Sequence, residues 1–355
     1  MTVGIEEELM LLDPATLDLA PRAAAVLARL AGDPRFVPEL PAAQLEIVGA
    51  PATTVGAAAA TLRTARADLA AAARDLALPA GAGVHPFAPA VGELTRGPRY
   101  DRIVAELGAN MHRQLVFGLH VHVAIGDPQR ALAVYNALRE HLPAIAALGA
   151  NAPFYEGRDT GLASVRPKLC DLLPRQGIPP VLPDWDAYAN ALAWGSDAAA
   201  PPRPFADARW WWEARLHPVH GTLEVRAADA QATVADTAAL AATVHALVAT
   251  LAERHDAGDL DDEPAPTWRI AENRWSAIRH GTRGTWTDPR TGTTRPTAHH
   301  LHDLLDDLGP AAQRLGCATE LAAARDLVER PRAELARAAG PQAWAAALAE
   351  RLLLG

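Results

Sequence analysis

Two glutamates near the start of the chain give the first indication of chemistry. The stretch Gly4 to Asp13 reads Gly-Ile-Glu-Glu-Glu-Leu-Met-Leu-Leu-Asp, so three carboxylates interrupt a run that is otherwise typical of a buried strand. Side chains alternate faces along a strand, which places Glu6 and Glu8 on one face, roughly 6 to 7 Å apart, and Glu7 on the other. Carboxylates this close repel each other unless a cation lies between them. The pattern indicates a divalent cation, and the alternative is a first strand whose acids face water.

The same alternation recurs in three later segments that carry polar side chains on one face and apolar side chains on the other. The polar sets are Gln44 and Glu46, His120 and His122, and Glu224 and Arg226. Carboxylates and imidazoles without thiolates favour a hard cation, Mg²⁺ or Mn²⁺, over zinc. Such a cation commonly serves phosphates, so ATP is the expected ligand. The competing interpretations are half-exposed histidines and a solvated ion pair.

Cationic residues concentrate in the long loop between two of these segments. Arg158, inside Gly-Arg-Asp-Thr-Gly, and Arg166 lie in a Gly- and Pro-rich stretch from Tyr155 to Pro183. Arginines near a metal site suit anionic substrates, while an ordinary surface connection is the alternative. Neither a P-loop nor a dinucleotide-binding glycine pattern occurs, which excludes the two commonest nucleotide folds.

The bulk composition limits the classes of partner. The chain has 355 residues, of which 50% are hydrophobic, and shows no evident linker, so we expect residues 1–355 to form a single domain. A net charge of -9 disfavours a nucleic-acid binder. Cys170 and Cys317 lack zinc or redox spacing and are expected to be free thiols. No export segment and no apolar run of about 20 residues is evident, which predicts a cytoplasmic protein without a membrane partner.

The segments together predict an α+β fold. Strands with one polar and one apolar face suit an antiparallel sheet whose apolar face is covered by helices and whose open, concave face is a reaction site. Ala-rich segments predict the helices, the longest at Thr54–Leu78 and Ala235–His255. The strand that contains Glu46 is expected to run from Phe36 to Val48, and Gly281–Pro296 is expected to form a hairpin.

Six motifs in order over nearly the whole chain resemble the carboxylate-amine ligase family, also called glutamate–cysteine ligase type 2. They are Gly4-Ile-Glu-Glu-Glu-Leu-Met-Leu-Leu, Gln44-Leu-Glu, Gly118-Leu-His-Val-His-Val, Gly157-Arg-Asp-Thr-Gly, Gly221-Thr-Leu-Glu-Val-Arg and Glu272-Asn-Arg-Trp. The same strands are more distantly similar to glutamine synthetase. The resemblance implies a glutamine synthetase-like catalytic fold, in which a curved antiparallel half-barrel with helices on its outer face surrounds Mg²⁺ and ATP.

The resemblance also implies roles for individual residues. The implied metal ligands are Glu6, Glu8, Glu39, Glu46, His120 and Glu224. The implied nucleotide contacts are His120, His122, Arg226, Asn273 and Arg274. The implied substrate contacts are Arg158, Arg166 and Arg215. Catalysis would rest on Glu8, Glu224 and Arg226, of which Arg226 would face the transferred phosphoryl group.

Four positions depart from the family pattern. Phe117 stands where a cysteine is usual, and Leu216 stands where a proline is usual. Leu162 and Val165 occupy places where tyrosines are expected. Because the metal-binding strands are intact, the departures concern the acid and amine pockets rather than the ATP chemistry.

The predicted activity is ATP-dependent formation of an amide bond through an acyl phosphate, with release of ADP. The family implies glutamate and cysteine as substrates, which would give γ-glutamylcysteine; a different amino acid or a specialised biosynthetic acid is the first alternative. A phosphotransferase and a non-catalytic metal- or nucleotide-binding regulator are the others. The expected partners are small molecules, and a homodimer is compatible with the sequence. The sequence does not assign the base that deprotonates the amine.

Overall fold

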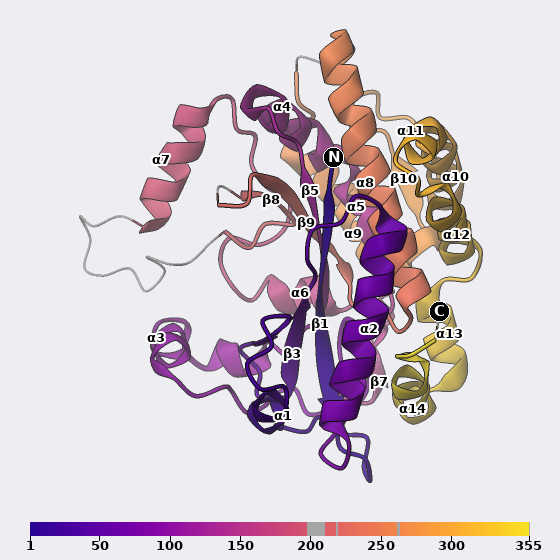
Figure 1. Cartoon of the computed structure of the whole chain (residues 1–355). Helices are drawn as coiled ribbons and strands as arrows, with labels where there is room; N and C mark the ends of the chain where they lie inside the picture. The colour runs from indigo at the N-terminus through magenta and orange to yellow at the C-terminus, as the bar shows by residue number, and fades with distance from the viewer. Residues whose placement is uncertain (197–209, 218, 261–262, 355) are drawn as a thin grey trace.

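An antiparallel sheet of seven strands lies at the centre of the computed structural model, which describes residues 1–196, 210–217, 219–260 and 263–354 (Figure 1). Its order is β2-β3-β1-β5-β9-β8, with β4 also paired to β1. The strands are β1 (Val3–Leu12), β2 (Phe36–Pro38), β3 (Gln44–Val48), β4 (Leu78–Ala80), β5 (Gly118–Ala124), β8 (Ala214–His217) and β9 (Thr222–Asp229). The predicted α+β class with an antiparallel sheet is confirmed.

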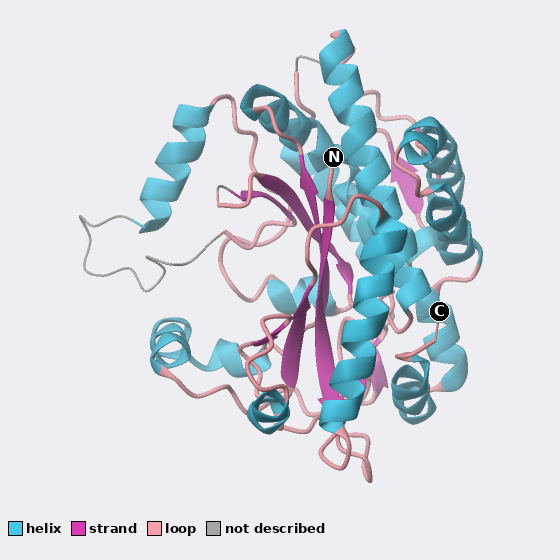
Figure 2. Ribbon diagram, viewed as in Figure 1, coloured by secondary structure: helices cyan, strands magenta, loops and turns pink. Residues whose placement is uncertain are grey.

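Helices cover one face of this sheet (Figure 2). The inner layer consists of α2 (Val55–Ala73), α4 (Pro128–Leu138), α5 (Leu142–Gly149) and α8 (Val234–Ala257). Behind α8 lie α10 (Thr297–Asp307), α11 (Gly309–Arg314) and α12 (Ala318–Glu329). The remaining helices are α1 (Ala23–Arg29), α3 (Pro98–Leu107), α6 (Arg166–Cys170), α7 (Trp185–Ser196), α9 (Thr267–His280), α13 (Arg332–Ala339) and α14 (Pro341–Arg351).

The longest helix, α8, has clear signals at both ends. Thr233 accepts a hydrogen bond from the Asp236 N–H at 3.1 Å, and Gly258 ends the helix with φ 75°. Among the described residues α8 alone is long and apolar enough to cross a membrane, but 89% of its apolar window is buried inside the fold. The burial shows that α8 is a helix of the protein core.

The alternation of faces along β1 is as predicted. Ile5 and Leu9 are buried in the core beneath the helices, together with Glu7. Arg66 of α2 donates Nη2 to Glu7 Oε1 at 2.7 Å and Nε to Oε2 at 2.9 Å, and the Thr237 hydroxyl of α8 donates to Oε1 at 2.5 Å. Glu7 is therefore a buried structural carboxylate, separated by its face from Glu6 and Glu8.

The prediction of one strand from Phe36 to Val48 is wrong. Residues 36–38 and 44–48 form two antiparallel strands, β2 and β3, with Val37 opposite Glu46. Pro38 and Pro41 lack an N–H and cannot continue a ladder, so the chain turns between them. The turn has a functional consequence, because it brings Glu39 back beside Glu46.

The structure also tests one predicted helix and the predicted hairpin. The helix predicted from Thr54 to Leu78 ends at Ala73, because Asp75 has a left-handed φ of 67° and Leu78 then begins β4. The hairpin predicted for Gly281–Pro296 is present as β10 (Thr285–Thr287) and β11 (Thr294–Pro296). A second small hairpin joins β6 (Phe154–Tyr155) to β7 (Arg158–Asp159).

Candidate active site

Strand register brings the polar residues of the open face together. Across the sheet the opposed pairs are Glu8 and Glu46, Glu6 and His120, His122 and Glu224, and Arg215 and Glu224. Directly opposed side chains on one face of an antiparallel sheet lie within reach of each other. The four polar strand segments of the sequence therefore form one continuous site on β3, β1, β5 and β9.

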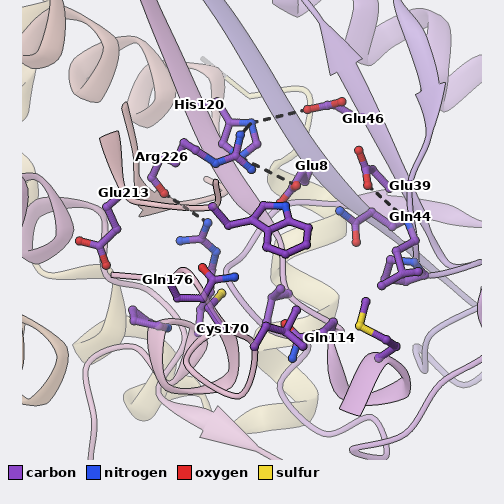
Figure 3. Close-up of a pocket in the computed structure, with 18 of the residues that line it drawn as sticks. Glu8, Glu39, Gln44, Glu46, Gln114, His120, Cys170, Gln176, Glu213 and Arg226 are labelled. Atoms are coloured by element: carbon purple, nitrogen blue, oxygen red, sulfur yellow. Dashed lines mark hydrogen bonds and ion pairs between the residues drawn. The ribbon is translucent and has the colours of Figure 1, made fainter. Parts of the chain in front are cut away.

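His120 lies beside the carboxylates of Glu8 and Glu46 (Figure 3). Its Nδ1 is 3.4 Å from Glu6 Oε2 and 3.6 Å from Glu46 Oε1, and its Nε2 is 3.8 Å from Glu8 Oε1. Burial and the charge of Arg226 oppose protonation of the imidazole, but the glutamates outweigh them and raise the pKa of His120 to about 9. The site thus concentrates negative charge around this ring.

Glu224 is a buried carboxylate held by two guanidinium groups. Arg215 Nη2 is 2.6 Å from Glu224 Oε2, and Arg226 pairs with the other oxygen. Burial opposes ionisation, but Arg226 and Arg215 hold the pKa of Glu224 well below its usual range. Arg226 Nη1 also lies 3.4 Å from His120 Nδ1. A fixed positive charge therefore borders the carboxylate cluster.

The open face forms a cavity of about 300 Å³. Its sheet side carries Glu6, Glu8, Glu46, His120 and Arg226. Side chains from α3, α6 and α9 close it on the other side, including those of Tyr100, Arg166, Cys170 and Arg274. Acidic and cationic groups thus face each other across a space large enough for a small substrate.

The donor set fits a hard divalent cation. Three groups of ligand atoms lie within 4.8 Å of one another: Glu6, His122 and Glu224; Glu6, Glu46 and His120; and Glu8, Glu39 and Glu46. The Nε2 atoms of His120 and His122 are buried and make no hydrogen bond to the described residues. Burial and the charges of Glu46 and Glu8 raise the pKa of Glu39 to about 8. A bound cation would give the two histidine nitrogens a partner and would reduce the repulsion between the carboxylates.

Most of the predicted site residues converge on this cavity. The lining includes Glu6, Glu8, Glu39, Glu46, His120, Arg166, Arg215, Arg226 and Arg274. His122 and Glu224 stand behind them, with His122 Nε2 3.3 Å from Glu6 Oε2 and Nδ1 3.0 Å from Thr222 Oγ1. These two side chains support the lining residues from within the sheet.

Two predicted contacts lie elsewhere. Asn273 donates Nδ2 to the Thr287 carbonyl at 2.6 Å and accepts from the Thr287 N–H at 2.9 Å, so it anchors β10. Arg158 is exposed on β7 and is not part of the cavity wall. Neither placement gives geometric support to the predicted role.

Several cavity residues were not predicted from the sequence. They are Arg99, Tyr100, Gln114, Gln176, Trp211 and Glu213. Most of them come from helices or loops, where no alternation marks the inward face. Glu213 could have been found from the sequence, because it lies directly before β8 and two residues before Arg215, whose face it shares at strand spacing.

The four departures from the family pattern lie outside the cavity wall. Phe117 is fully buried in an apolar cluster with Met10, and Val165 is buried in a smaller cluster that Leu162 borders. Leu216 faces the main core. These side chains contact neighbouring apolar groups and do not line the cavity between the acids and the arginines.

Comparison with known proteins places the chain in a family. A model of glutamate–cysteine ligase family 2 matches residues 2–352. A Rubrobacter xylanophilus protein, provisionally named glutamate–cysteine ligase 2-3, is 37% identical over 349 residues, which cover 95% of this chain and 93% of the relative. A Rhodococcus jostii protein, provisionally named glutamate–cysteine ligase 2-2, is 36% identical over 336 residues, covering 93% and 89%.

Solved structures share the fold at low sequence identity. The Francisella tularensis glutamate–cysteine ligase in complex with AMP has a TM-score of 0.72 at 13% identity, covering 99% of this chain and 88% of that one. A bifunctional glutathione synthetase from Pasteurella multocida has a TM-score of 0.68 at 15% identity, covering 99% and 52%. The predicted enzyme class, an ATP-dependent carbon–nitrogen ligase, is the class of this family. The chain belongs to glutamate–cysteine ligase family 2.

Proposed function

We propose that this chain joins the γ-carboxyl group of glutamate to the amino group of cysteine, with ATP as the phosphoryl donor and Mg²⁺ as the metal. The observation that supports this most is the position of Arg226, which borders the cluster of Glu6, Glu8, Glu46 and His120 inside one cavity. Acids for a metal and a fixed cation for a phosphoryl group are the two requirements of phosphoryl transfer.

Each set of residues has a distinct part in the proposed reaction. Glu6, Glu8, Glu39, Glu46, His120 and Glu224 would hold the metal, with His122 beside them. When bound, a divalent cation would neutralise the negative charge of the triphosphate. Arg226 stabilises the charge of the phosphoryl group in transfer, and Arg215 keeps Glu224 ionised and in place.

The proposed reaction has two steps. A carboxylate oxygen of the acid attacks the γ-phosphorus, the bond to the bridging oxygen breaks, and an acyl phosphate and ADP result. The amine nitrogen then attacks the acyl carbon, phosphate leaves with the bonding electron pair, and a proton is lost from nitrogen. Phosphorylation is needed because an unmodified carboxylate has no adequate leaving group. Arg166, which lines the cavity, would bind a substrate anion.

The finer architecture belongs to the same proposal. We infer that the open face of the sheet curves as a half-barrel around the nucleotide, and that residues 1–355 act as one catalytic unit in the cytoplasm on small molecules. Nucleic acid and membrane have no part in this scheme. A homodimer is compatible with it.

The test is a product analysis. Purified protein with Mg-ATP, L-glutamate and L-cysteine should release ADP and phosphate in equal amounts, together with γ-glutamylcysteine identified by mass spectrometry. A panel of other acids and amines tests the alternative substrates. AMP and pyrophosphate would contradict the acyl-phosphate route, ADP without amide would indicate a phosphotransferase, and ATP binding without acid-dependent ADP release would indicate a regulator.

A further inference from the structure

Glu213 is a buried carboxylate with one oxygen unused. Its side chain lines the catalytic cavity, and the residue is only 9% exposed. Arg274 Nε donates to Oε1 at 2.5 Å, whereas Oε2 is buried and has no hydrogen-bond partner among the described residues. An unsatisfied buried carboxylate oxygen is costly, so a ligand group that donates a hydrogen bond would stabilise it.

The arginine beside Glu213 makes no hydrogen bond to the second oxygen. Arg274 donates Nη1 and Nη2 to Asp171, at 3.1 and 3.0 Å, and only Nε donates to Glu213. The two carboxylates therefore fix the guanidinium in one orientation. Oε2 of Glu213 is kept in place without being neutralised by a second donor.

The backbone of Glu213 is fixed next to the phosphoryl-facing arginine. The Glu213 N–H donates to the Gly177 carbonyl at 2.9 Å, and the Glu213 carbonyl accepts from the Arg226 N–H at 2.8 Å. Figure 3 shows Glu213 and Glu39 at opposite sides of the cavity. Glu213 also belongs to none of the three groups of candidate metal ligands. It is a second acidic position, separate from the proposed metal site.

A protonated amine matches this position best. It brings a positive charge to a carboxylate and three N–H donors to an oxygen that lacks one. Trp211 lines the same cavity, and tryptophan is the aromatic side chain that attracts ammonium groups most strongly. The reaction also requires an amine to approach the acyl carbon from beside the phosphoryl group, and Arg226, the neighbour of Glu213, faces that group.

We propose that Glu213 binds the ammonium group of the amine substrate through Oε2. This inference rests on the proposed ligase function for the identity of the ligand, but not for its chemical class. The site then has two parts: the acids on β1 and β3 serve the metal and nucleotide, and Glu213, one residue before β8, binds the amine.

Binding without turnover tests this proposal independently of the ligase activity. The probes are 2-aminobutyrate, an amino acid of the size of cysteine without its thiol, and butyrate, which lacks the ammonium group. Calorimetry is done with Mg²⁺, a non-hydrolysable ATP analogue and excess L-glutamate. We expect the full-length protein to bind 2-aminobutyrate about tenfold or more tightly than butyrate, and Glu213→Gln to lose most of this preference. A wild-type protein without the preference, or a Glu213→Gln variant that keeps it, would overturn the proposal.

Matched variants separate this role from a structural one. Glu350→Gln, at an exposed position on α14, makes the same chemical change and should keep the wild-type preference. Glu213→Asp keeps the carboxylate and should retain part of the preference even if Glu213→Gln disturbs Arg274. A Glu213→Asp variant that is folded by circular dichroism and has no more preference than Glu213→Gln would also overturn the proposal.

Kinetics separate the amine from the acid. In Glu213→Gln the KM for the amine should rise about tenfold or more, whereas the KM for glutamate should change less than about twofold. A larger rise in the KM for glutamate would show that Glu213 binds the α-ammonium group of the acid instead. If the wild-type protein releases no ADP with any acid but still prefers 2-aminobutyrate, then the proposed function fails and the ammonium site stands.

Discussion

Glu7 and Arg66 form an ion pair in which neither side chain has any exposed surface, with 2.7 Å between Glu7 Oε1 and Arg66 Nη2. Arg66 also donates to the carbonyl oxygens of Gln231, Ala232 and Leu352. One guanidinium group therefore joins β1 to two distant parts of the chain. The adjacent glutamates, Glu6 and Glu8, face the candidate active site, so neighbouring carboxylates on one strand lie in two different environments.

Removing this guanidinium should destabilise the fold. Arg66→Met leaves Glu7 buried without its partner, and we expect the free energy of unfolding to fall by about 3–5 kcal/mol. Urea denaturation followed by circular dichroism measures the change. The exposed Arg63 on the same helix gives the control, since Arg63→Met should change the value by less than about 1 kcal/mol. Equal effects of the two substitutions would contradict a special role for the buried pair.

Removing charge from the open face should leave the fold intact and stop the reaction. Glu8→Gln removes a proposed metal ligand, and Arg226→Ala removes the cation beside His120. In each variant we expect kcat/KM to fall by about a thousandfold, with circular dichroism spectra like those of the wild type. Full activity in either variant would show that the open face of the sheet is not the active site.

A methyl group at Gly118 should disturb the site directly. A Cβ atom at this position would lie 3.1 Å from Arg166 Cζ and 3.2 Å from Glu8 Oε2, with a terminal nitrogen of Arg166 closer still. Gly118→Ala should therefore displace both side chains and lower kcat/KM by about a hundredfold. Gly309→Ala is the control, because a Cβ there meets nothing within 4 Å. If steady-state assays show similar activity for both variants, the crowding around Gly118 has no catalytic importance.

Metal binding should be visible as a gain in stability. Because the carboxylates repel each other without a cation, Mg²⁺ at about 100 times its Kd should raise the free energy of unfolding by about 2.7 kcal/mol, and EDTA should reverse this. Thermal unfolding with and without Mg²⁺ measures the effect. Glu46→Gln should shrink the Mg²⁺-dependent rise in Tm, since Glu46 belongs to two of the three groups of ligand atoms. An undiminished rise in that variant would place the metal elsewhere.

A buried histidine should make stability depend on pH. Burial lowers the pKa of His245 in α8 from 6.5 to about 4, so between these values the unfolded chain binds the proton more readily than the folded chain. The contribution of His245 is therefore complete above pH 6.5 and is lost as the pH falls towards 4, a change of roughly 3 kcal/mol. Denaturation series at several pH values should show a flatter dependence for His245→Leu. If the free energy of unfolding depends on pH in the same way in the wild type and the variant, His245 is not the cause of this dependence.

The faces of the strands could be predicted because a strand has a period of two. Glu6, Glu8 and Glu46 were assigned to the open face from spacing alone, and the contacts around His120 agree. The lateral order of the strands does not follow from spacing, since it depends on which distant segments pair. The resemblance to a family predicted the kind of fold, and the order of the strands in the sheet comes from the structure.

The other half of the cavity was not predictable in the same way. Arg99 and Tyr100 come from a helix, of which several faces could lie towards the sheet, and Gln176 comes from a loop. Asn273, a polar residue in a matching motif, is not part of the cavity wall and bonds Thr287 of the hairpin. The interrupted strand at Pro41 placed Glu39 in a turn, which alternation along a continuous strand could not foresee.

The three consecutive glutamates of β1 also limit how this strand can be paired. A slip by one residue would turn Glu6 and Glu8 inward and move Ile5 and Leu9 out of the core. Only one of the two inward carboxylates could then pair with Arg66, and the other would be buried uncompensated at a penalty of several kcal/mol. The acidic run, although unusual in a central strand, thus makes misaligned pairing unfavourable and helps select the alignment that assembles the candidate active site.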